Sequence, residues 1–142
     1  MPHKLLVCDD EPFILKALTF ILRKEGHTVL EARNGEEALE KIRGERPAVV
    51  FLDVMMPKKS GFEVLQEIRA DASFAPVYII LLTAKGQDSD RERGLSLGAN
   101  EFMTKPFSPA NILARLREIL AARDAPPAAG PTGAAGATGA TG

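Results

Sequence analysis

Short apolar runs alternate along the chain with longer segments whose apolar positions recur at helical spacing. The runs are residues 5–8, 28–32, 48–52, 77–82 and 101–104. The third and fourth runs show no regular alternation with polar residues, which is typical of strands covered on both faces. The pattern therefore predicts five strands, with a parallel arrangement in the middle of the sheet.

Residues typical of helix termini flank the segments between the runs. The N-terminal signals are Pro12 in the first helix, Asn34 with Glu37 in the second, Ser60 with Glu63 in the third and Ser108-Pro109 in the last. Proline suits the first helical position, and a small polar residue three places before a glutamate forms a capping box. We expect Gly26 and Gly44 to close the first two helices.

The segment 87–97 differs from the other predicted helices, because only Leu95 and Leu97 are large and apolar. We expect a helix that the sheet holds weakly and that moves if any helix does. Together the segments predict a strand and a helix repeated five times, which gives an α/β fold with a doubly wound sheet and right-handed crossovers. In such sheets, functional residues gather beyond the carboxyl ends of the strands.

Composition and charge narrow the class of function. The 18 Lys and Arg residues nearly balance the 19 Asp and Glu residues, which argues against a nucleic-acid or membrane surface. A single cysteine excludes an internal disulfide and suits a reducing compartment. The apolar runs are far shorter than the roughly 20 residues that span a bilayer, and the N-terminus lacks a signal-peptide pattern. We expect a cytoplasmic protein.

The end of the chain has a composition of its own, dominated by Pro, Gly, Ala and Thr. We expect a folded domain at residues 1–123 and a disordered tail at residues 124–142, because the tail has little to bury. Glycine recurs at every third position, at Gly130, Gly133, Gly136, Gly139 and Gly142, as it does in collagen. A trimerising triple helix is the alternative, but the repeat is short and contains a single proline after Gly130.

Polar residues follow four of the five predicted strands. They are Asp9 and Asp10 after the first strand, Asp53 after the third, Thr83 after the fourth and Lys105 after the fifth. Carboxylates that meet without a partner repel one another strongly, and a divalent cation would remove that repulsion. Because all candidate ligands are oxygens, Mg²⁺ or Mn²⁺ fits better than zinc. An ammonium and a hydroxyl beside such a cation are what a phosphoryl group requires, so the pattern predicts a phosphoryl-transfer site.

Asp53 is the candidate nucleophile of this site. It stands alone after a buried strand and precedes a turn whose backbone N–H groups can meet a phosphoryl oxygen, and aspartyl phosphate is an established covalent intermediate. Asp9 and Asp10 are then the metal ligands. Each residue alone also has an ordinary explanation: a helix cap for Asp10 and Glu11, a loop acid for Asp53, and plain surface or strand-end positions for the lysine and threonine. These explanations do not account for complementary groups at four strand ends.

Several stretches of the sequence resemble the receiver domains of two-component response regulators. They are Cys8-Asp9-Asp10-Glu11-Pro12, Asp53-Val54-Met55-Met56-Pro57 with Gly61, Leu82-Thr83-Ala84, and residues 98–107 from Gly98 to Phe107. The stretches appear in the family's order and spacing, and the likeness covers residues 4–122. The resemblance implies a flavodoxin-like fold, with a five-stranded parallel sheet of order 2-1-3-4-5 and five helices.

The resemblance also implies a role for each residue of the site. Asp53 would accept a phosphoryl group from the phosphohistidine of a histidine kinase or a histidine phosphotransfer protein. The domain would catalyse only its own phosphorylation and dephosphorylation, and so would not be an enzyme with a separate substrate. The implied ligands of Mg²⁺ (or Mn²⁺) are Asp10, Asp53, the Met55 carbonyl and, through water, Asp9. The implied phosphate-binding residues are Lys105, Thr83, Ala84 and Met55, and Pro106 would follow a cis peptide bond.

A conformational switch is part of the same resemblance. Thr83 would move onto a phosphoryl oxygen, and Phe102 would rotate into the space that Thr83 leaves. This motion would shift an equilibrium in the face made by the fourth helix, the fifth strand and the fifth helix, through which the domain would signal to a downstream protein. The sequence does not identify that protein. Phe102 lacks the hydroxyl of a tyrosine and also suits an ordinary core position.

Residues 83–117 are especially similar to receivers of winged-helix transcription factors, which dimerise through this face. Arg91, Glu101 and Arg115 suit the ion pairs between subunits, whereas Asn111 stands where those proteins often carry an acid. A phosphorylation-dependent homodimer is therefore compatible with the sequence, although Asn111 argues against it. The residues after the last predicted helix are too few for a DNA-binding domain, so we expect a receiver without an output domain.

Two other functions compete with this interpretation. A Mg²⁺-dependent phosphatase of the haloacid dehalogenase type also uses an aspartyl nucleophile, but such enzymes carry a second acid two residues later, where Met55 stands here. A phosphate-independent interaction module would have no need for the complete set of polar residues from Asp9 to Lys105.

Overall fold

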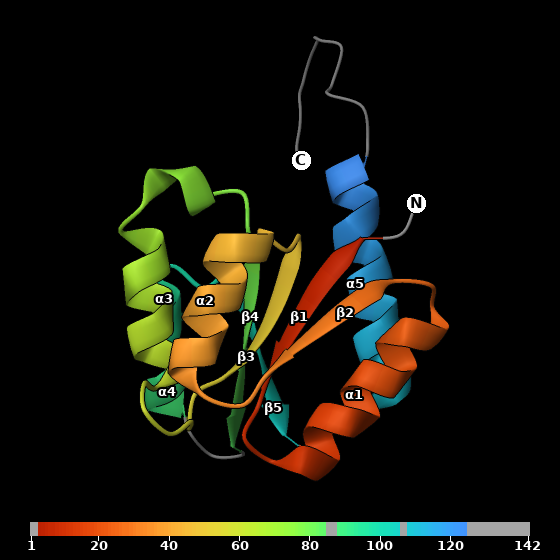
Figure 1. The fold of residues 1–142 in the computed structure, drawn as a ribbon, viewed down its shortest axis with the longest axis horizontal. Coiled ribbons are helices and arrows are strands. Elements are labelled where there is room, and N and C mark those ends of the chain that lie inside the picture. Colours follow the sequence, from red (N-terminus) through yellow and green to blue (C-terminus); the bar gives the residue numbers. More distant parts are fainter. Residues whose placement is uncertain (1–2, 85–87, 106–107, 125–142) are drawn as a thin grey trace, which may run out of the picture. The chain divides into compact units, whose positions relative to one another are not determined.

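The computed structural model describes residues 3–84, 88–105 and 108–124. Figure 1 shows strands and helices alternating along the chain. The strands are β1 (Lys4–Cys8), β2 (Thr28–Ala32), β3 (Val49–Asp53), β4 (Tyr78–Ala84) and β5 (Glu101–Lys105). The helices are α1 (Pro12–Lys24), α2 (Gly35–Glu45), α3 (Gly61–Arg69), α4 (Asp88–Ser96) and α5 (Pro109–Asp124), with a short 3-10 helix at Ala72–Phe74. The chain divides into two compact units, residues 1–109 with the whole sheet and residues 110–142.

The five strands form one parallel sheet in the order β2-β1-β3-β4-β5, which confirms the predicted doubly wound sheet. The chain first runs outward from β1 to β2 and then places β3 on the other side of β1. This reversal creates a switch point between β1 and β3, where sheets of this kind bind ligands. The register pairs Cys8 with Leu52 and Asp53 with Leu82, so these strands end at the same edge.

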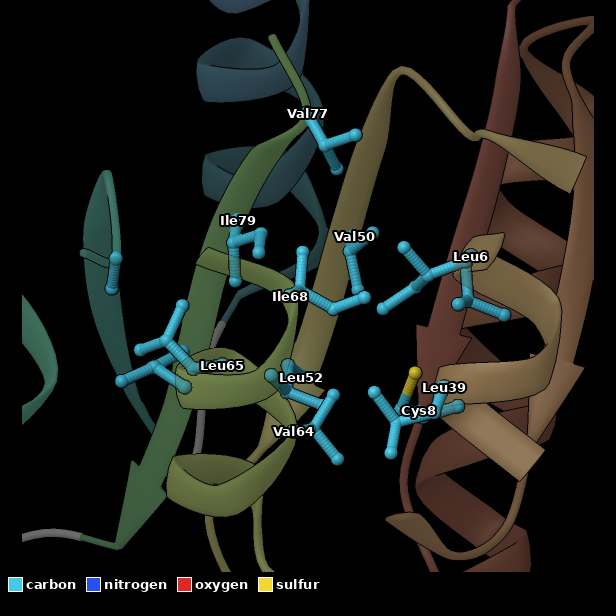
Figure 2. Close-up of a cluster of buried hydrophobic side chains, with 14 of the residues drawn as sticks. Leu6, Cys8, Leu39, Val50, Leu52, Val64, Leu65, Ile68, Val77 and Ile79 are labelled. Carbon is cyan, nitrogen blue, oxygen red and sulfur yellow. The ribbon is translucent and has the colours of Figure 1, made fainter. Parts of the chain in front are cut away.

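One face of the sheet packs against α2 and α3 (Figure 2). Strand residues spaced two apart supply this face, namely Leu6 and Cys8 of β1, Val50 and Leu52 of β3, and Ile79 and Leu81 of β4. Their helical partners are Ala38, Leu39 and Ile42 of α2 and Val64, Leu65 and Ile68 of α3. Burying a large aliphatic side chain contributes about 1.5–3 kcal/mol to stability. The cluster therefore fixes β1 and β3, the two strands that lead into the candidate acids.

The Cys8 thiol belongs to this buried cluster. Burial raises its pKa well above the ordinary value, and the neighbouring charge of Asp9 raises it further. A thiol that stays protonated is a poor nucleophile, so Cys8 acts as a small apolar core residue.

The helix ends agree with the sequence in α1 and correct it in α2. Pro12 begins α1 as predicted, and Gly26 lies just beyond its end with a φ of 95°. The prediction that Gly44 closes the second helix is wrong, because α2 continues through Gly44 to its last residue, Glu45. Arg46 follows in the left-handed conformation with a φ of 47°, and its N–H caps the helix where a glycine is more usual.

The two predicted capping boxes differ in the structure. In α2, Asn34 accepts a hydrogen bond from the Glu37 N–H, but the Glu37 carboxylate accepts from the Arg33 N–H instead of the Asn34 N–H. In α3, Ser60 and Glu63 form the complete reciprocal box. The box therefore closes fully only at α3, the helix that follows Asp53.

Strands β3 and β4 extend further than the apolar runs predicted. Asp53 pairs in register with Leu82, and Thr83 pairs with Thr104, so both polar residues belong to their strands. The strands are longer because the backbone N–H and C=O groups continue to pair beyond the last apolar residue. This pairing does not depend on the type of side chain. The pairing fixes the backbones of Asp53 and Thr83 at the carboxyl ends of their strands.

Helix α4 has the weak apolar hold that the sequence predicts. Of residues 89–96, whose burial the structure describes, Gly94 alone is buried, so none of the side chains in this range is. Leu95, its one large apolar residue, is 41% exposed. The motion expected of this helix stays a prediction.

The second compact unit contains α5, whose apolar residues recur at helical spacing. Those that are buried are Ile112, Leu116, Ile119 and Leu120. Arg115 and Glu118 form an ion pair within this helix at 3.0 Å. Among the described residues, no helix is long and apolar enough to cross a membrane.

Candidate functional site

Three aspartates meet where β1 and β3 end. Asp9 and Asp10 follow the last residue of β1, and Asp53 is the last residue of β3. One carboxylate oxygen from each lies within 4.8 Å of the others, so the structure brings together the acids that the sequence predicted. Asp9 and Asp53 are buried, whereas Asp10 is exposed. The site thus has a buried wall and an open side.

Lys105 brings an ammonium group into this acidic site from the end of β5. Its Nζ lies 2.8 Å from Asp9 Oδ2, 3.4 Å from Asp53 Oδ2 and 3.5 Å from Glu11 Oε1. Burial alone would lower the pKa of Lys105, but the hydrogen bond to Asp9 and the charges of Asp53 and Asp9 outweigh it and raise the pKa. Lys105 therefore stays charged, as one cation among several carboxylates.

The raised pKa of Asp53 shows that Lys105 compensates only part of the negative charge of the carboxylates and of the effect of burial. Burial and the charge of Asp9 raise that pKa from 3.8 to about 7, while Lys105 and the N–H of Met55 act in the opposite direction. The Met55 N–H donates to Asp53 Oδ1 at 3.3 Å. A proton or a metal cation on this carboxylate would remove the remaining repulsion.

The aspartate triad fits a hard divalent cation. All of its donor atoms are carboxylate oxygens, the ligands that Mg²⁺ and Mn²⁺ prefer. Ligands on opposite sides of Mg²⁺, each about 2.1 Å from the ion, are about 4.2 Å apart. The oxygens of the triad lie within 4.8 Å of one another, so they are close enough to surround one ion, directly or through a water.

A cavity of about 540 Å³ opens beside the triad. Its lining comes from the ends of β1, β3, β4 and β5 and from α4, and comprises Asp10, Glu11, Asp53, Val54, Met55, Thr83, Asp90 and Lys105. The predicted residues Met55 and Thr83 therefore face the same space as Asp53. Such a cavity, with carboxylates, an ammonium and a hydroxyl at its wall, can hold a phosphoryl group and a cation.

Two lining residues, Glu11 and Asp90, were not predicted as part of the site. Glu11 stands at the start of α1 and suggested a helix cap, yet its side chain makes no cap hydrogen bond and reaches Lys105 instead. Asp90 lies in the first turns of α4, where a helix that follows a site-bearing strand begins. The position of Asp90 shortly after Thr83 was the one indication in the sequence that it could reach the site. The spacing alone does not distinguish it from other surface acids.

The proposed switch residues lie on neighbouring strands. Thr83 is buried in β4, and Phe102 of β5 is partly buried against the core cluster. The register pairs Phe102 with Leu81 and Ala84 with Lys105. The guanidinium of Arg91 in α4 lies 4.7 Å from the centre of the Phe102 ring, so this ring contacts α4 as well as the core. Pro106 and the tail at residues 125–142 lie outside the described residues.

Comparison with known proteins gives a consistent result. A model of the response regulator receiver domain family matches residues 5–117. The alkaline phosphatase synthesis transcriptional regulatory protein PhoP of Bacillus subtilis is 45% identical over 120 residues, which cover 84% of this chain and 49% of that protein. The probable transcriptional regulator ycf27 of Guillardia theta is 49% identical over 118 residues, 83% of this chain and 45% of that protein. The chain thus spans about half the length of these curated relatives.

Solved structures agree. The crystal structure of a putative response regulator from Chloroflexus aurantiacus superposes with a TM-score of 0.80 at 35% identity, and covers 85% of this chain and 99% of that one.

Proposed function

The chain belongs to the response regulator receiver domain family, and on that premise we propose that Asp53 is its phosphoacceptor. A receiver is a regulatory domain and not an enzyme in the ordinary sense. The observation that carries the proposal is the meeting of Asp9, Asp10 and Asp53 with Lys105 at the switch point of the sheet. The phosphodonor is the phosphohistidine of a histidine kinase or of a histidine phosphotransfer protein.

We assign Mg²⁺ (or Mn²⁺) to the aspartate triad. Asp10, Asp53 and the Met55 carbonyl would hold the ion directly, and Asp9 would help through water. When bound, the cation supplies positive charge that keeps the Asp53 carboxylate ionised and balances the oxygens of the phosphoryl group. The all-oxygen donor set and the raised pKa of Asp53 support this assignment.

In the transfer itself, an Asp53 carboxylate oxygen attacks phosphorus as the bond from phosphorus to the histidine nitrogen breaks. Lys105 already contacts Asp53 and Asp9, so its ammonium can follow the growing charge onto the phosphoryl oxygens. Thr83, on the wall of the same cavity, donates its hydroxyl to one of these oxygens, and the Ala84 N–H serves another. The buried β3 backbone keeps the nucleophile in place during the step.

Signalling then runs from Thr83 to α4. Movement of Thr83 onto the phosphoryl group gives Phe102 room to rotate, and this rotation alters the Arg91 contact that joins the ring to α4. None of the side chains at residues 89–96 of α4 is buried, so its displacement exposes little apolar surface. We propose that the domain signals to its downstream protein through α4, β5 and α5, by a shift between existing conformations.

A phosphorylation-dependent homodimer is part of this proposal. Its ion pairs would draw on Arg91, Glu101 and Arg115. Within the chain, Glu101 accepts a hydrogen bond from the Tyr78 hydroxyl at 2.6 Å, and Arg115 pairs with Glu118. A dimer would have to exchange or share these contacts, which makes it weaker than one built on free side chains.

The remaining expectations from the sequence keep the status of proposals. These are the division into a receiver at residues 1–123 and a disordered tail at 124–142, and a cytoplasmic location without nucleic-acid or membrane partners. Membership in the receiver family argues against the alternative of a Mg²⁺-dependent phosphatase.

Phosphorylation by acetyl phosphate tests the central proposal. With Mg²⁺ present, intact-mass measurement should show one added phosphoryl group on the wild-type chain and none on Asp53→Asn. The exposed Asp124→Asn, at the end of α5, is the matched control and should react like the wild type. Unchanged labelling of Asp53→Asn, or no labelling of the wild type at any Mg²⁺ concentration, would overturn the assignment.

A further inference from the structure

The first turn of α2 lies against the loop that follows Asp53. Gly35, the first residue of α2, donates its N–H to the Pro57 carbonyl at 3.3 Å. A Cβ built on Gly35 would lie 2.2 Å from the carbonyl oxygen of Lys59 and 2.4 Å from its Cβ. These atoms belong to or adjoin the backbone and cannot swing aside as the end of a long side chain can. A side chain at position 35 therefore has to displace the loop.

The loop at residues 54–61 is held by internal backbone hydrogen bonds, which limit how far it can be displaced. The Gly61 N–H donates to the Val54 carbonyl at 2.9 Å, which closes the loop at its base, and the Lys59 N–H donates to the Pro57 carbonyl at 2.8 Å. Lys58 sits between these bonds with a left-handed φ of 70°. A push on Lys59 is therefore passed along a short, internally bonded backbone toward Val54 and the neighbouring Met55.

Met55 is the point where this loop meets the site. Its N–H donates to Asp53 Oδ1 at 3.3 Å, while its side chain is 73% exposed. The contribution of Met55 to the site is consequently made by its backbone, and depends on where the loop is held. In the proposed function, the Met55 carbonyl is also a ligand of the metal.

We propose that Gly35 is a positioning residue for phosphorylation: its missing side chain lets α2 hold the loop where the Met55 backbone meets Asp53. This inference rests on the proposed function, because Met55 acts there on the cation. Gly35 touches neither the phosphoryl group nor the cation, and acts only through the loop. An ion pair between Lys58 and Glu36 at 3.7 Å joins the same two segments a second time at the surface.

Gly44 offers a matched control within the same helix. A Cβ at Gly44 meets nothing within 4 Å, and replacing a glycine by alanine inside a helix generally stabilises the helix. A role in helix formation alone would make Gly35→Ala and Gly44→Ala behave alike. A positioning role separates the two variants in their Mg²⁺ affinity.

The test compares Gly35→Ala, Gly44→Ala and the wild type in Mg²⁺ titration and in phosphorylation by acetyl phosphate. Each protein is first shown to be folded by its cooperative unfolding. We expect Gly35→Ala to bind Mg²⁺ about tenfold more weakly, as changes behind a metal ligand commonly do, and to be phosphorylated more slowly at saturating Mg²⁺. Gly44→Ala should match the wild type in both. Folded Gly35→Ala with wild-type affinity and rate overturns the inference.

A measurement on the wild type keeps the test decisive if Gly35→Ala does not fold. In ¹⁵N spectra recorded during Mg²⁺ titration, the Gly35 amide should shift with the same midpoint as the Met55 amide, while Gly44 should not shift. A stationary Gly35 signal beside a titrating Met55 signal contradicts the inference. A wild type that binds Mg²⁺ but gains no phosphoryl group refutes the proposed function alone, whereas absence of Mg²⁺ binding refutes both.

Discussion

Helices α3 and α4 have the same length of nine residues but are held in the fold very differently. Each follows a strand that carries a site residue, Asp53 in β3 and Thr83 in β4. The buried residues of α3 are Gly61, Phe62, Val64, Leu65 and Ile68. Among residues 89–96 of α4, by contrast, Gly94 alone is buried, and it has no side chain. Helix α3 is therefore held by its buried side chains, whereas α4 has no buried side chain among residues 89–96.

Two contacts that α4 makes with the rest of the fold join an arginine to an aromatic ring. Arg93 places its guanidinium 4.4 Å from the centre of the Phe62 ring, and Arg91 does the same over Phe102 at 4.7 Å. Such contacts contribute about 0.5–1 kcal/mol each at exposed sites, against about 1.5–3 kcal/mol for each large side chain buried by α3. In the proposed function, the phosphoacceptor Asp53 lies next to the firmly packed helix α3, and the signal is transmitted through the weakly packed helix α4. The proposal therefore predicts that a small free energy from phosphorylation moves α4.

The largest expected contrast is between Leu65→Ala in α3 and Leu95→Ala in α4. Leu65 is fully buried, so its truncation leaves a cavity and should lower the free energy of unfolding by about 2–5 kcal/mol. Leu95 is 41% exposed, and its truncation should lower the free energy of unfolding by less than about 1 kcal/mol. Urea unfolding of both variants measures the difference. Equal costs would show that α4 is as firmly held as α3, and would break the comparison.

Much of this contrast could be predicted from the sequence. The Ser60 and Glu63 pair predicted the start of α3, and the lack of large apolar residues in segment 87–97 predicted that the sheet holds α4 weakly. The end of α2 was misjudged, since Gly44 inside a helix reads the same as a glycine that closes one. That Arg46 takes the left-handed position depends on tertiary contacts, including its guanidinium over the Phe74 ring at 4.2 Å, which no local pattern contains.

The candidate site was predictable to the extent that it lies at strand ends. Asp9, Asp10, Asp53 and Lys105 follow apolar runs, so knowledge of a parallel sheet was enough to bring them together. Glu11 and Asp90 face the same cavity from helices, where the direction of a side chain depends on how the helix is set against the sheet. The close approach of α2 to the loop after Asp53 was hidden for the same reason, because it joins segments distant in sequence.

The second contrast compares Asp53 at the end of β3, which carries a titrating group, with Thr83 in β4, which does not. Because the pKa of Asp53 is raised to about 7 in the folded chain, folding favours its protonated form. The stability this gives is fully present below the ordinary pKa of 3.8 and is lost as the pH rises through about 7. Asp53→Asn avoids the loss. At about 1.36 kcal/mol per pKa unit, a shift from 3.8 to about 7 corresponds to at most about 4 kcal/mol. The variant also loses the ion pair with Lys105, so we expect it to be more stable than the wild type by about 1–3 kcal/mol at high pH.

Unfolding in urea at pH 4 and pH 8, with a chelator present, measures this effect. The advantage of Asp53→Asn should appear at pH 8 and fade toward pH 4, and saturating Mg²⁺ should shrink it. Thr83→Val is the comparison at the end of β4, because it removes no titrating group and should change stability equally at both pH values. An Asp53→Asn effect that does not depend on pH would contradict the pKa assigned to Asp53.

The smallest contrast compares one serine in each helix region. Ser60 Oγ accepts from the Glu63 N–H at 3.2 Å, while the Glu63 carboxylate accepts from the Ser60 N–H at 2.8 Å. Ser60→Ala removes the first bond and should lower the free energy of unfolding by about 1 kcal/mol, whereas Ser60→Thr should retain most of it. Ser96 ends α4, is exposed and donates to the Arg93 carbonyl, so Ser96→Ala should change stability by less than about 0.5 kcal/mol. A cost for Ser96→Ala as large as that for Ser60→Ala would mean that the end of α4 is a fixed part of the fold, and that phosphorylation would have to break it before α4 could move.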